Sequence, residues 1–472
     1  MENGNLLSMS NVLSHELFDE VFVTVSAVDP INIQQFRLQN NIPIRSCTVS
    51  EKFIKFNDSK PYENSSMLYS NISDVNTITI ENCGFFKNWN YEIPQTNIAK
   101  NFIGLCPEEE IMRYCSLWLW DYLRRCIPGG IKGFIVPLSG GLDSSSVVCI
   151  VYSLCRFLHH QIYSVKNQNV IKSLEPIFDT EAHELQPQDI CQRLLRCCYL
   201  RTKFSGQDSY DRAKNLAQLV GANFQTYDLT DIYQKIIDTV PLGIKTKSTD
   251  DVTIQQQNVQ ARIRMVLTYY MSECNRLVLA TGNVDEALVG YLTKYDCSSA
   301  DLNPIGSISK NDLKRFMIYS KQIIPNSEQV LDHIINAIPS AELTGQDQKD
   351  EEDLGLTYDE LSLFGRIRRG MYGTYGPYGM FCKIWNDRHA DHVRQVFNGQ
   401  LVEPTLLASK IKRFFTLYAR NRHKQTILTP SLHTETYSPD DNRFDHRQFL
   451  FNTKWPWQFE QIDKMIEQIL NG

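Results

Sequence analysis

The chain has 472 residues, of which 42% are hydrophobic and 22% are charged, and its formal net charge at pH 7 is -6. This length is enough for about two to four domains, and the composition is typical of globular proteins. A mildly acidic chain is not expected to be a general nucleic-acid binder, and no apolar run approaches about 18 residues, so we expect neither a nucleic-acid partner nor a membrane span.

The first residues and the cysteines bear on the compartment. The chain does not open with a basic segment followed by an apolar one, so we expect no signal peptide. Thirteen cysteines, an odd number without a Cys-x-x-Cys pair, argue against a disulfide framework and against a zinc site. These features favour a reducing compartment, and we expect a cytoplasmic protein.

The first hundred residues do not resemble an independent domain. Residues 20–28 alternate like a strand, whereas residues 34–80 are rich in Asn and Ser with scattered apolar residues, which is typical of an irregular arm. From Pro107 the pattern changes: three glutamates form an acidic first turn, and residues 111–125 predict an amphipathic helix. Pro128 and the two glycines after it are expected to end that helix.

Residues 135–148 read Ile-Val-Pro-Leu-Ser-Gly-Gly-Leu-Asp-Ser-Ser-Ser-Val-Val. This order predicts a strand, a phosphate-binding loop and a buried helix that includes residues 147–158. Gly140 and Gly141 would let the backbone adopt positive φ and approach a ligand, so that successive amides and the helix N-terminus can point at one anion. A bare Ser-Gly-Gly is equally compatible with an ordinary turn, but the Asp and Ser that follow and the flanking strand and helix favour phosphate binding.

An acidic residue inside an anion-binding loop needs an explanation. Asp143 would repel a phosphate unless a divalent cation lay between them, so we expect Mg²⁺ there. No Gly-Lys-Ser/Thr follows, so the loop is not a Walker A loop, and no Gly-x-Gly-x-x-Gly indicates a Rossmann dinucleotide site. The loop resembles the pyrophosphate loop of the N-type ATP pyrophosphatases, which cleave ATP to AMP and pyrophosphate.

Helices and strands alternate after the loop. Residues 159–174 are polar and expected to be exposed, and the predicted elements that follow are a helix at 211–220 ended by Gly221, a strand at 224–229, a helix at 259–270 and a strand at 276–281. This alternation predicts a parallel, doubly wound α/β sheet. Because ligands bind at the carboxyl ends of such strands, residues 138–143 and 281–286 are expected to face one cleft.

Three later segments have unusual compositions. Residues 341–354 are polar and acidic, which by itself predicts a solvated loop. Residues 365–379 are rich in Arg, Gly and Tyr, as RNA-binding tracts can be. The segment is short, however, and the chain as a whole is acidic, so we do not expect it to bind RNA. Residues 410–422 predict a basic amphipathic helix that runs into His423 and Lys424.

Two polar clusters lie in the second half of the predicted sheet. Residues 257–264 open a helix, and a helix cap plus surface charge explains them most simply. Residues 279–302 combine a strand end, a glycine turn, two carboxylates, a lysine and further aspartates. Packing alone would not require so many polar groups.

Together with the phosphate loop, these residues resemble the synthetase domain of NAD⁺ synthetases, in particular the eukaryotic glutamine-dependent branch. The resemblance covers about residues 107–459, and its further motifs are residues 293–301, 308–313, 350–358, 421–424 and 437–445. It implies an α/β fold of the adenine nucleotide alpha hydrolase type, with a doubly wound parallel sheet and flanking helices, over residues 106–472.

The resemblance also implies a ligase reaction in two steps. The carboxylate of nicotinic acid adenine dinucleotide (deamido-NAD⁺) attacks the α-phosphate of ATP and releases pyrophosphate, and ammonia then attacks the adenylated carboxyl group to give NAD⁺ and AMP. Such a site has to stabilise charge on phosphates and hold two nucleotides in line.

The resemblance assigns roles to individual residues at matching positions. Ser139, Asp143, Glu286 and Lys310 would carry the catalysis, with Asp143 and Glu286 sharing Mg²⁺ and Lys310 meeting phosphates. The implied ATP-binding residues are Ser139, Gly140, Gly141, Leu142, Asp143, Ser144, Ser145 and Thr281. The implied deamido-NAD⁺-binding residues are Asn258, Glu286, Lys294, Asp296, Asp301 and Lys424.

Three further expectations follow from the resemblance. Residues 341–354 correspond to a mobile flap near the site, and the family precedent implies a homodimer or a larger homo-oligomer. For Cys297 a place in the core or in the wall of the site is expected rather than catalysis, since the chemistry needs no thiol nucleophile.

The resemblance breaks in residues 1–105. Full-length members carry a nitrilase-like glutaminase domain whose Glu, Lys and Cys supply ammonia from glutamine. Residues 20–37 resemble its last strand and helix, and residues 86–99 resemble the arm that joins it to the synthetase, but the triad segments are absent. We therefore expect residues 1–105 to be a remnant of that domain, and none of Cys47, Cys83 and Cys106 to be a nucleophile.

Two interpretations remain open. The chain could be a short form of the enzyme that uses free ammonia and not glutamine. Alternatively, it could be a non-catalytic nucleotide-binding subunit that regulates or assembles with the full-length enzyme. The presence of Asp143, Glu286 and Lys310 favours catalysis.

Overall fold

The computed structural model of the chain describes residues 105–178, 185–240, 253–344, 349–369, 375–427, 429–433 and 451–471. Several sequence-based expectations therefore lie outside the described residues: the strand at 20–28, the resemblances at 20–37 and 86–99, Cys47 and Cys83, and the motif at 437–445.

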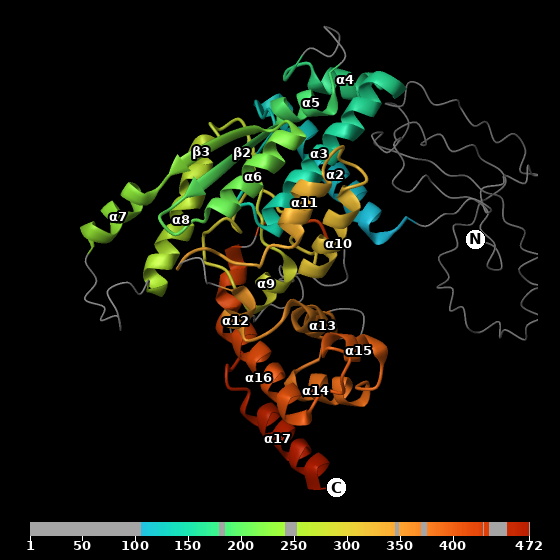
Figure 1. Cartoon of the computed structure of the whole chain (residues 1–472), viewed down its shortest axis with the longest axis vertical. Helices are drawn as coiled ribbons and strands as arrows, with labels where there is room; N and C mark the ends of the chain where they lie inside the picture. The colour runs from blue at the N-terminus through green and yellow to red at the C-terminus, as the bar shows by residue number, and fades with distance from the viewer. Residues whose placement is uncertain are drawn as a thin grey trace, which may run out of the picture. The chain divides into compact units, whose positions relative to one another are not determined.

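A four-stranded parallel sheet lies at the centre of the described region, in the order β3–β2–β1–β4 (Figure 1). Its strands are β1 (Phe134–Pro137), β2 (Leu195–Arg201), β3 (Asn223–Asp228) and β4 (Leu277–Val278). Phe134 pairs with Leu195 of β2 on one side and with Leu277 of β4 on the other. The direction in which strands are added reverses at β1, which confirms the doubly wound sheet and makes the carboxyl end of β1 the expected place for a ligand.

Alternate residues of the strands enter two apolar layers. Phe134 and Val136 pack with α3 (Leu142–His159) and α6 (Gln207–Val220) on one face. Ile135 packs on the other face with α7 (Thr230–Thr239) and α8 (Ile254–Met271). The sequence analysis did not predict β2, whose sequence is Leu-Arg-Cys-Cys-Tyr-Leu-Arg. A strand that is buried on both faces has no polar face, so its sequence lacks the alternation of apolar and polar residues by which strands are predicted.

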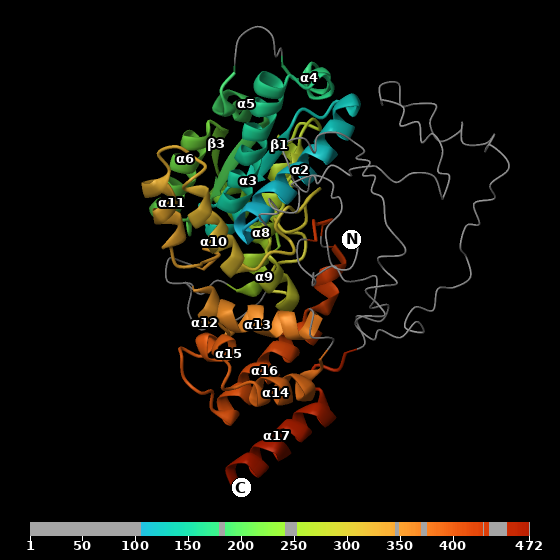
Figure 2. The ribbon, with the colours of Figure 1, turned by 90° about the vertical axis from the view of Figure 1, so that its right-hand side faces the viewer.

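Further helices complete the layer that contains α3. Figure 2 shows α2 lying alongside α3, and both contribute to the same apolar cluster. The helices of this layer are α2 (Pro107–Cys126), α4 (Gln168–Leu174), α5 (Pro187–Leu194), α10 (Lys310–Ser320) and α11 (Glu328–Ile335).

Local sequence signals explain several boundaries. Helix α2 begins with Pro107 in its first turn and three glutamates behind it, and it ends in the turn η4 (Ile127–Gly129) before Gly130, whose φ is 97°. These features confirm the predicted start and stop. The predicted exposed segment 159–174 is wrong in part, because it forms a π-helical turn, η5 (His160–Val165), and α4, which bury Ile162, Val170 and Leu174.

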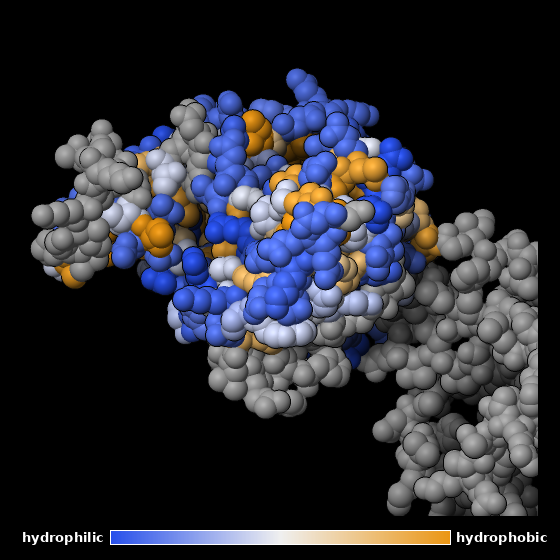
Figure 3. All heavy atoms as spheres, turned by 90° about the horizontal axis from the view of Figure 1, so that it is seen from below, coloured by the Kyte–Doolittle hydropathy of each residue, from blue (hydrophilic) through white to orange (hydrophobic). Residues whose placement is uncertain are grey.

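A second apolar cluster is built from the helices that follow α11. They are α12 (Asp350–Leu354), α13 (Tyr358–Arg369), α14 (Pro377–Asn386), α15 (Asp391–Val396), α16 (Pro404–Arg420) and α17 (Pro456–Asn471), with the turn η6 (Arg422–Ile427) after α16. We call them the helical module. Seen from the side on which α17 lies, the described surface is mostly hydrophilic with separate hydrophobic areas (Figure 3).

The helical module accounts for two of the unusual segments. The basic amphipathic helix predicted at 410–422 is confirmed as part of α16, which buries Ile411, Phe414 and Phe415. The Arg-, Gly- and Tyr-rich segment 365–379 contributes to α13 and α14, although residues 370–374 lie outside the described part. No helix in the described ranges is both long and apolar enough to cross a membrane.

Candidate active site

The loop between β1 and α3 adopts the predicted strand–loop–helix arrangement. Gly140 has a φ of 79°, and a Cβ placed on it would lie 2.1 Å from the backbone oxygen of Ser209 in α6. Gly141 instead has a φ of -83° and is the N-cap residue of α3, so the expectation of positive φ is confirmed for Gly140 and wrong for Gly141. The loop therefore needs a glycine at position 140 both for its backbone conformation and for its contact with α6.

Serine hydroxyls shape this loop. The Ser139 and Ser144 hydroxyl oxygens are 3.0 Å apart, and the Ser144 hydroxyl also accepts a hydrogen bond from the Ser139 amide at 3.2 Å. The Gly141 amide donates to the Ser139 hydroxyl at 3.3 Å. Ser145 is fully buried behind the loop, and its hydroxyl has no protein hydrogen-bond partner within the described part of the chain.

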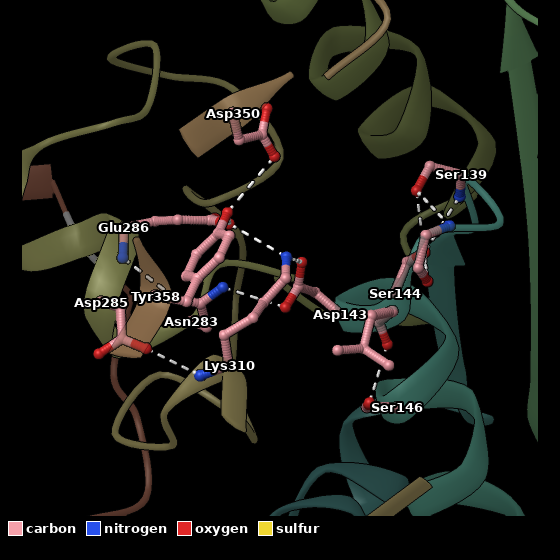
Figure 4. A network of polar contacts seen from close by, with 12 residues as sticks. Ser139, Asp143, Ser144, Ser146, Asn283, Asp285, Glu286, Lys310, Asp350 and Tyr358 are labelled. Carbon is pink, nitrogen blue, oxygen red and sulfur yellow. Dashed lines mark hydrogen bonds and ion pairs between the residues drawn. The ribbon is translucent and has the colours of Figure 1, made fainter. Parts of the chain in front are cut away.

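Three charged side chains meet beside the loop (Figure 4). The Lys310 ammonium donates to the Asp143 carboxylate and to Glu286 Oε1, the latter at 3.2 Å. Asn283 Nδ2 donates to Asp143 Oδ1 at 3.0 Å. These contacts join the first turn of α3 to α9 (Val284–Val289) and α10, so the prediction that residues 138–143 and 281–286 face one cleft is confirmed.

Helix caps hold these side chains in place. Asn283 caps α9 by accepting a hydrogen bond from the Glu286 amide at 3.1 Å, and Ser309 caps α10 by accepting one from the Asp312 amide at the same distance. Oδ2 of the buried Asp285 carboxyl group accepts a hydrogen bond from the Lys310 amide at 2.8 Å. Lys310 is thus fixed at the first position of α10, with its side chain directed at Asp143.

The helical module contributes a tyrosine to this site. The Tyr358 hydroxyl lies 3.0 Å from Glu286 Oε1 and 3.3 Å from Asp350 Oδ2, and Tyr291 donates to the other oxygen of Asp350 at 3.1 Å. The segment 341–354, which was predicted to be a solvated loop, ends in the short helix α12, where Asp350 and Leu354 are buried while Glu351, Glu352 and Asp353 are exposed as expected. Sequence reasoning missed Tyr358 as a site residue, although it stands in the motif at 350–358.

Burial and neighbouring charges perturb the acids and the base of this site. Burial raises the pKa of Glu286, and Asp143 and Asp350 raise it further, while Lys310 opposes them. Burial alone would lower the pKa of Lys310, but the adjacent Asp143 and Glu286 outweigh it and raise that pKa above its ordinary value. Burial also raises the pKa of Asp350.

A cavity of about 560 Å³ opens in front of these groups. Its lining includes Ser139, Gly141, Leu142, Asp143, Ser144, Thr281, Glu286 and Lys310, all of which were predicted site residues. It also includes three cationic side chains that the sequence analysis did not single out: Arg212, Arg264 and Lys314. Arg264 lies in the segment 257–264, so the explanation of that segment by a cap and surface charge is incomplete.

The carboxylates of Asp143 and Glu286 are suited to sharing a cation. Both accept hydrogen bonds from one ammonium, so their oxygens converge on one point. Among the described residues, no group of three or more His, Cys, Asp or Glu side chains is arranged to hold a metal. Two carboxylates without a full protein cage are typical of Mg²⁺ sites that are completed by nucleotide phosphates and water, so the residues fit the expected ion in that setting.

The predicted deamido-NAD⁺ residues are only partly brought together. Asp296 lines the cavity, but its two carboxylate oxygens accept hydrogen bonds from the Thr293 and Ser298 amides, each at 2.8 Å. Asn258 Oδ1 accepts from the Thr293 hydroxyl at 2.8 Å and does not line the cavity. These contacts organise the loop at 293–298.

The remaining predicted residues of this group lie away from the cavity lining. Asp301 Oδ2 accepts a hydrogen bond from the Val278 amide at 2.8 Å. Lys424 donates to the carbonyls of Gly290 and Leu292 at 2.8 and 2.7 Å, and the Lys294 ammonium lies 5.5 Å from the ring centre of Tyr295. Roles of these residues in binding deamido-NAD⁺ stay predictions.

Cys297 belongs to the loop at 293–298, where it lines the cavity and packs against an apolar cluster that includes residues of α8. Burial raises the pKa of its thiol well above the ordinary value, which disfavours a thiolate. Its position agrees with the expected place in the wall of the site.

A doubly wound parallel sheet with a Ser/Gly loop and a carboxylate–lysine centre at its carboxyl edge defines a nucleotide-binding α/β protein. The chain belongs to the NAD synthase family, whose model, described as "NAD synthase", matches residues 111–364.

Individual relatives agree with this family. The chain is 43% identical over 388 residues to a glutamine-dependent NAD(+) synthetase of Mus musculus, covering 77% of this chain and 51% of that protein. It is 38% identical over 491 residues to one of Drosophila melanogaster, covering 99% of this chain and 56% of that protein. The chain thus spans about half the length of the curated relatives it matches.

A solved structure supports the fold. The crystal structure of a glutamine-dependent NAD(+) synthetase from Cytophaga hutchinsonii matches with a TM-score of 0.59 and 22% identity, covering 76% of this chain and 56% of that one. The predicted fold class is confirmed.

Proposed function

We propose that the chain is an NAD⁺ synthase, which adenylates the carboxylate of deamido-NAD⁺ with ATP and then amidates it with ammonia. The observation that carries the proposal is the convergence of Asp143, Glu286 and Lys310 beside the Ser/Gly loop. Family membership supports the reaction class, since the matched model covers this whole centre.

In the first step, a carboxylate oxygen of deamido-NAD⁺ forms a bond to the α-phosphorus of ATP. The bond from that phosphorus to the bridging oxygen breaks, and pyrophosphate leaves with the electron pair. The amides of the loop and the N-terminus of α3 would bind the leaving phosphates. Lys310, which the adjacent carboxylates keep protonated, would neutralise their growing charge.

In the second step, the nitrogen of ammonia forms a bond to the adenylated carbonyl carbon. AMP leaves with the electron pair of the broken C–O bond, and the nitrogen loses one proton to give the amide. Burial raises the pKa of the Asp350 carboxyl group above its ordinary value, so its carboxylate accepts a proton more readily than an exposed one and would take the proton that the nitrogen loses.

Asp143 and Glu286 would hold Mg²⁺ when nucleotide is bound. The ion would supply positive charge to the phosphates, and Lys310 would then turn from the carboxylates to a phosphate oxygen. The contacts of both carboxylates to one ammonium support this arrangement.

The proposal has a wider setting. Residues 106–472 would form the synthetase domain, the protein would act as a homodimer or larger homo-oligomer, and it would be cytoplasmic.

The test uses the purified chain with ATP, Mg²⁺, deamido-NAD⁺ and ammonium. NAD⁺, AMP and pyrophosphate should form in equal amounts. Asp143→Asn should slow pyrophosphate release at least about 100-fold, because it removes charge from the carboxylate–lysine centre. Asp121→Asn is the control and should leave the rate unchanged, because the Asp121 carboxylate pairs with Arg124 on the outer side of α2.

Two results would contradict the proposal. Nucleotide binding without turnover would favour the alternative of a regulatory or assembly subunit. Equal rates for Asp143→Asn and the unmodified chain would show that the centre at Asp143 does not carry the chemistry.

A further inference from the structure

Arg264 is a half-buried cation in the wall of the cavity. It stands on α8, and its Nε donates a hydrogen bond to the carbonyl oxygen of Leu200 near the carboxyl end of β2, at 3.3 Å. Burial lowers the pKa of Arg264, but an arginine stays protonated under all ordinary conditions. The protein therefore keeps a positive charge here that it has partly removed from water.

Within the described ranges, no carboxylate oxygen lies at ion-pair distance from this guanidinium. The acidic groups that act on its pKa from further away are the Cys297 thiol and the side chains of Glu342, Tyr199 and Asp296. By contrast, Arg196 pairs with Glu273 at 3.0 Å. Because an uncompensated charge of this kind is costly, the remaining N–H groups of Arg264 are suited to an anionic ligand in the cavity.

The position in the cavity indicates which anion this is. Near Arg264, the cavity lining includes Leu200, Ala261 and the ring of Tyr199, which offer apolar surface against which a nucleoside can pack. The hydroxyl-rich loop after the neighbouring strand β1 is suited to a pyrophosphate. In a nucleoside triphosphate, the group between the nucleoside and the pyrophosphate is the α-phosphate.

We propose that Arg264 binds the α-phosphate of the adenine nucleotide, an inference that rests on the proposed function. Its planar guanidinium can donate two parallel hydrogen bonds to one phosphate. In the first step it would stabilise the charge on the non-bridging oxygens while the carboxylate bonds to phosphorus and pyrophosphate leaves. In the second step the same contact would stabilise the phosphate of AMP as it departs with the electron pair.

The test compares ligands that differ by this one group. Isothermal titration of the full chain with adenosine, AMP and inorganic pyrophosphate separates nucleoside, α-phosphate and pyrophosphate binding. Arg264→Gln can still donate to the Leu200 carbonyl but has no charge, so it should weaken AMP binding at least about tenfold. Its affinities for adenosine and pyrophosphate should change less than about twofold.

Arg276→Gln is the matched control. Arg276 also donates to backbone carbonyls, those of Arg193 and Leu194 at 3.2 and 3.3 Å, but beside the amino end of β2. The control should bind all three ligands like the unmodified chain. Arg264→Lys, which keeps the charge but loses the planar fork, should bind AMP with an affinity between those of the unmodified chain and Arg264→Gln.

The outcomes separate the possible roles. Unchanged AMP affinity in Arg264→Gln overturns the inference and leaves the proposed function standing. Equal weakening of adenosine and AMP also overturns it, because Arg264 would then only shape the wall. An unmodified chain that binds neither adenosine nor AMP overturns the proposed function and this inference together.

Discussion

At the scale of single residues, Lys310 lies where Asp143 and Glu286 converge and neutralises part of their charge. Two positions around it lead to predictions. Tyr358 contacts Glu286 from the helical module, and Asp285 holds the backbone of Lys310 from α9.

Tyr358→Phe keeps the ring but removes the hydroxyl that contacts Glu286 and Asp350. We expect the rate of pyrophosphate release to fall about tenfold, since a hydrogen bond to a charged group is worth about 1.5 kcal/mol or more. Rapid-quench measurement of that step checks the prediction. Tyr227→Phe is the control, because its exposed hydroxyl contacts Gln225 on β3. Equal rates for both variants would show that the Tyr358 hydroxyl does not position the acids.

The buried carboxyl group of Asp285 should make the stability of the protein depend on pH. The Asp285 side chain is fully buried, and burial raises its pKa to about 8. An acid whose pKa is higher in the folded than in the unfolded state binds more protons when the protein is folded. The contribution of Asp285 to stability is therefore complete below about pH 4, the ordinary pKa of an aspartate, and is lost as the pH rises toward 8.

The free energy of unfolding should therefore fall between pH 5 and pH 7 in the unmodified chain relative to Asp285→Asn, which cannot titrate. The slope of this difference should approach about 1.4 kcal/mol per pH unit. Urea unfolding of both proteins at several pH values measures it. Parallel curves would mean that Asp285 is ionised in the folded protein.

At the scale of elements, the loop between β1 and α3 depends on its contact with α6. Gly140→Ala should destabilise the protein by about 2 kcal/mol more than Gly399→Ala, because both glycines have a φ near 80° but only Gly140 is crowded. A Cβ at position 140 would meet the Ser209 backbone at 2.1 Å, whereas nothing lies within 4 Å of one at position 399.

Urea unfolding of the two glycine variants gives the difference directly. Gly140→Ala should also slow pyrophosphate release, since the loop must shift away from α6. Equal destabilisation would mean that the backbone conformation alone, and not the contact with α6, requires the glycine.

At the scale of the whole described structure, the helical module supports the site through α13, which carries Tyr358. Phe364 on the same helix is fully buried and meets Phe414 edge to face, with ring centres 5.5 Å apart. Phe364→Ala should lower the free energy of unfolding by about 3–5 kcal/mol.

Phe364→Ala should also slow turnover at temperatures where the protein remains folded, because the packing that positions Tyr358 is loosened. Leu401→Ala, at a position that is 52% exposed, should change stability by less than about 0.5 kcal/mol. Calorimetry and steady-state assays measure both effects. Full activity in a destabilised Phe364→Ala protein would show that the site does not depend on this packing.

The sequence by itself determined the local structure. The strand, glycine loop and helix around residues 134–159 and the helices α2, α6, α8 and α16 were predictable, because periodicity, capping and glycine signals act within a few residues. Segments without such a signal, such as β2 and residues 159–174, were missed or wrongly assigned.

Only the tertiary structure decided which side chains meet. Lys310 and Asp143 are 167 positions apart in the chain, and Tyr358 and Glu286 are 72 apart. Local sequence patterns do not predict contacts between residues so far apart in the chain. These contacts depend on how the chain crosses the sheet and how the helical module packs. Tertiary structure therefore placed the Lys310 ammonium between the two predicted metal ligands and brought Arg264 into the cavity wall.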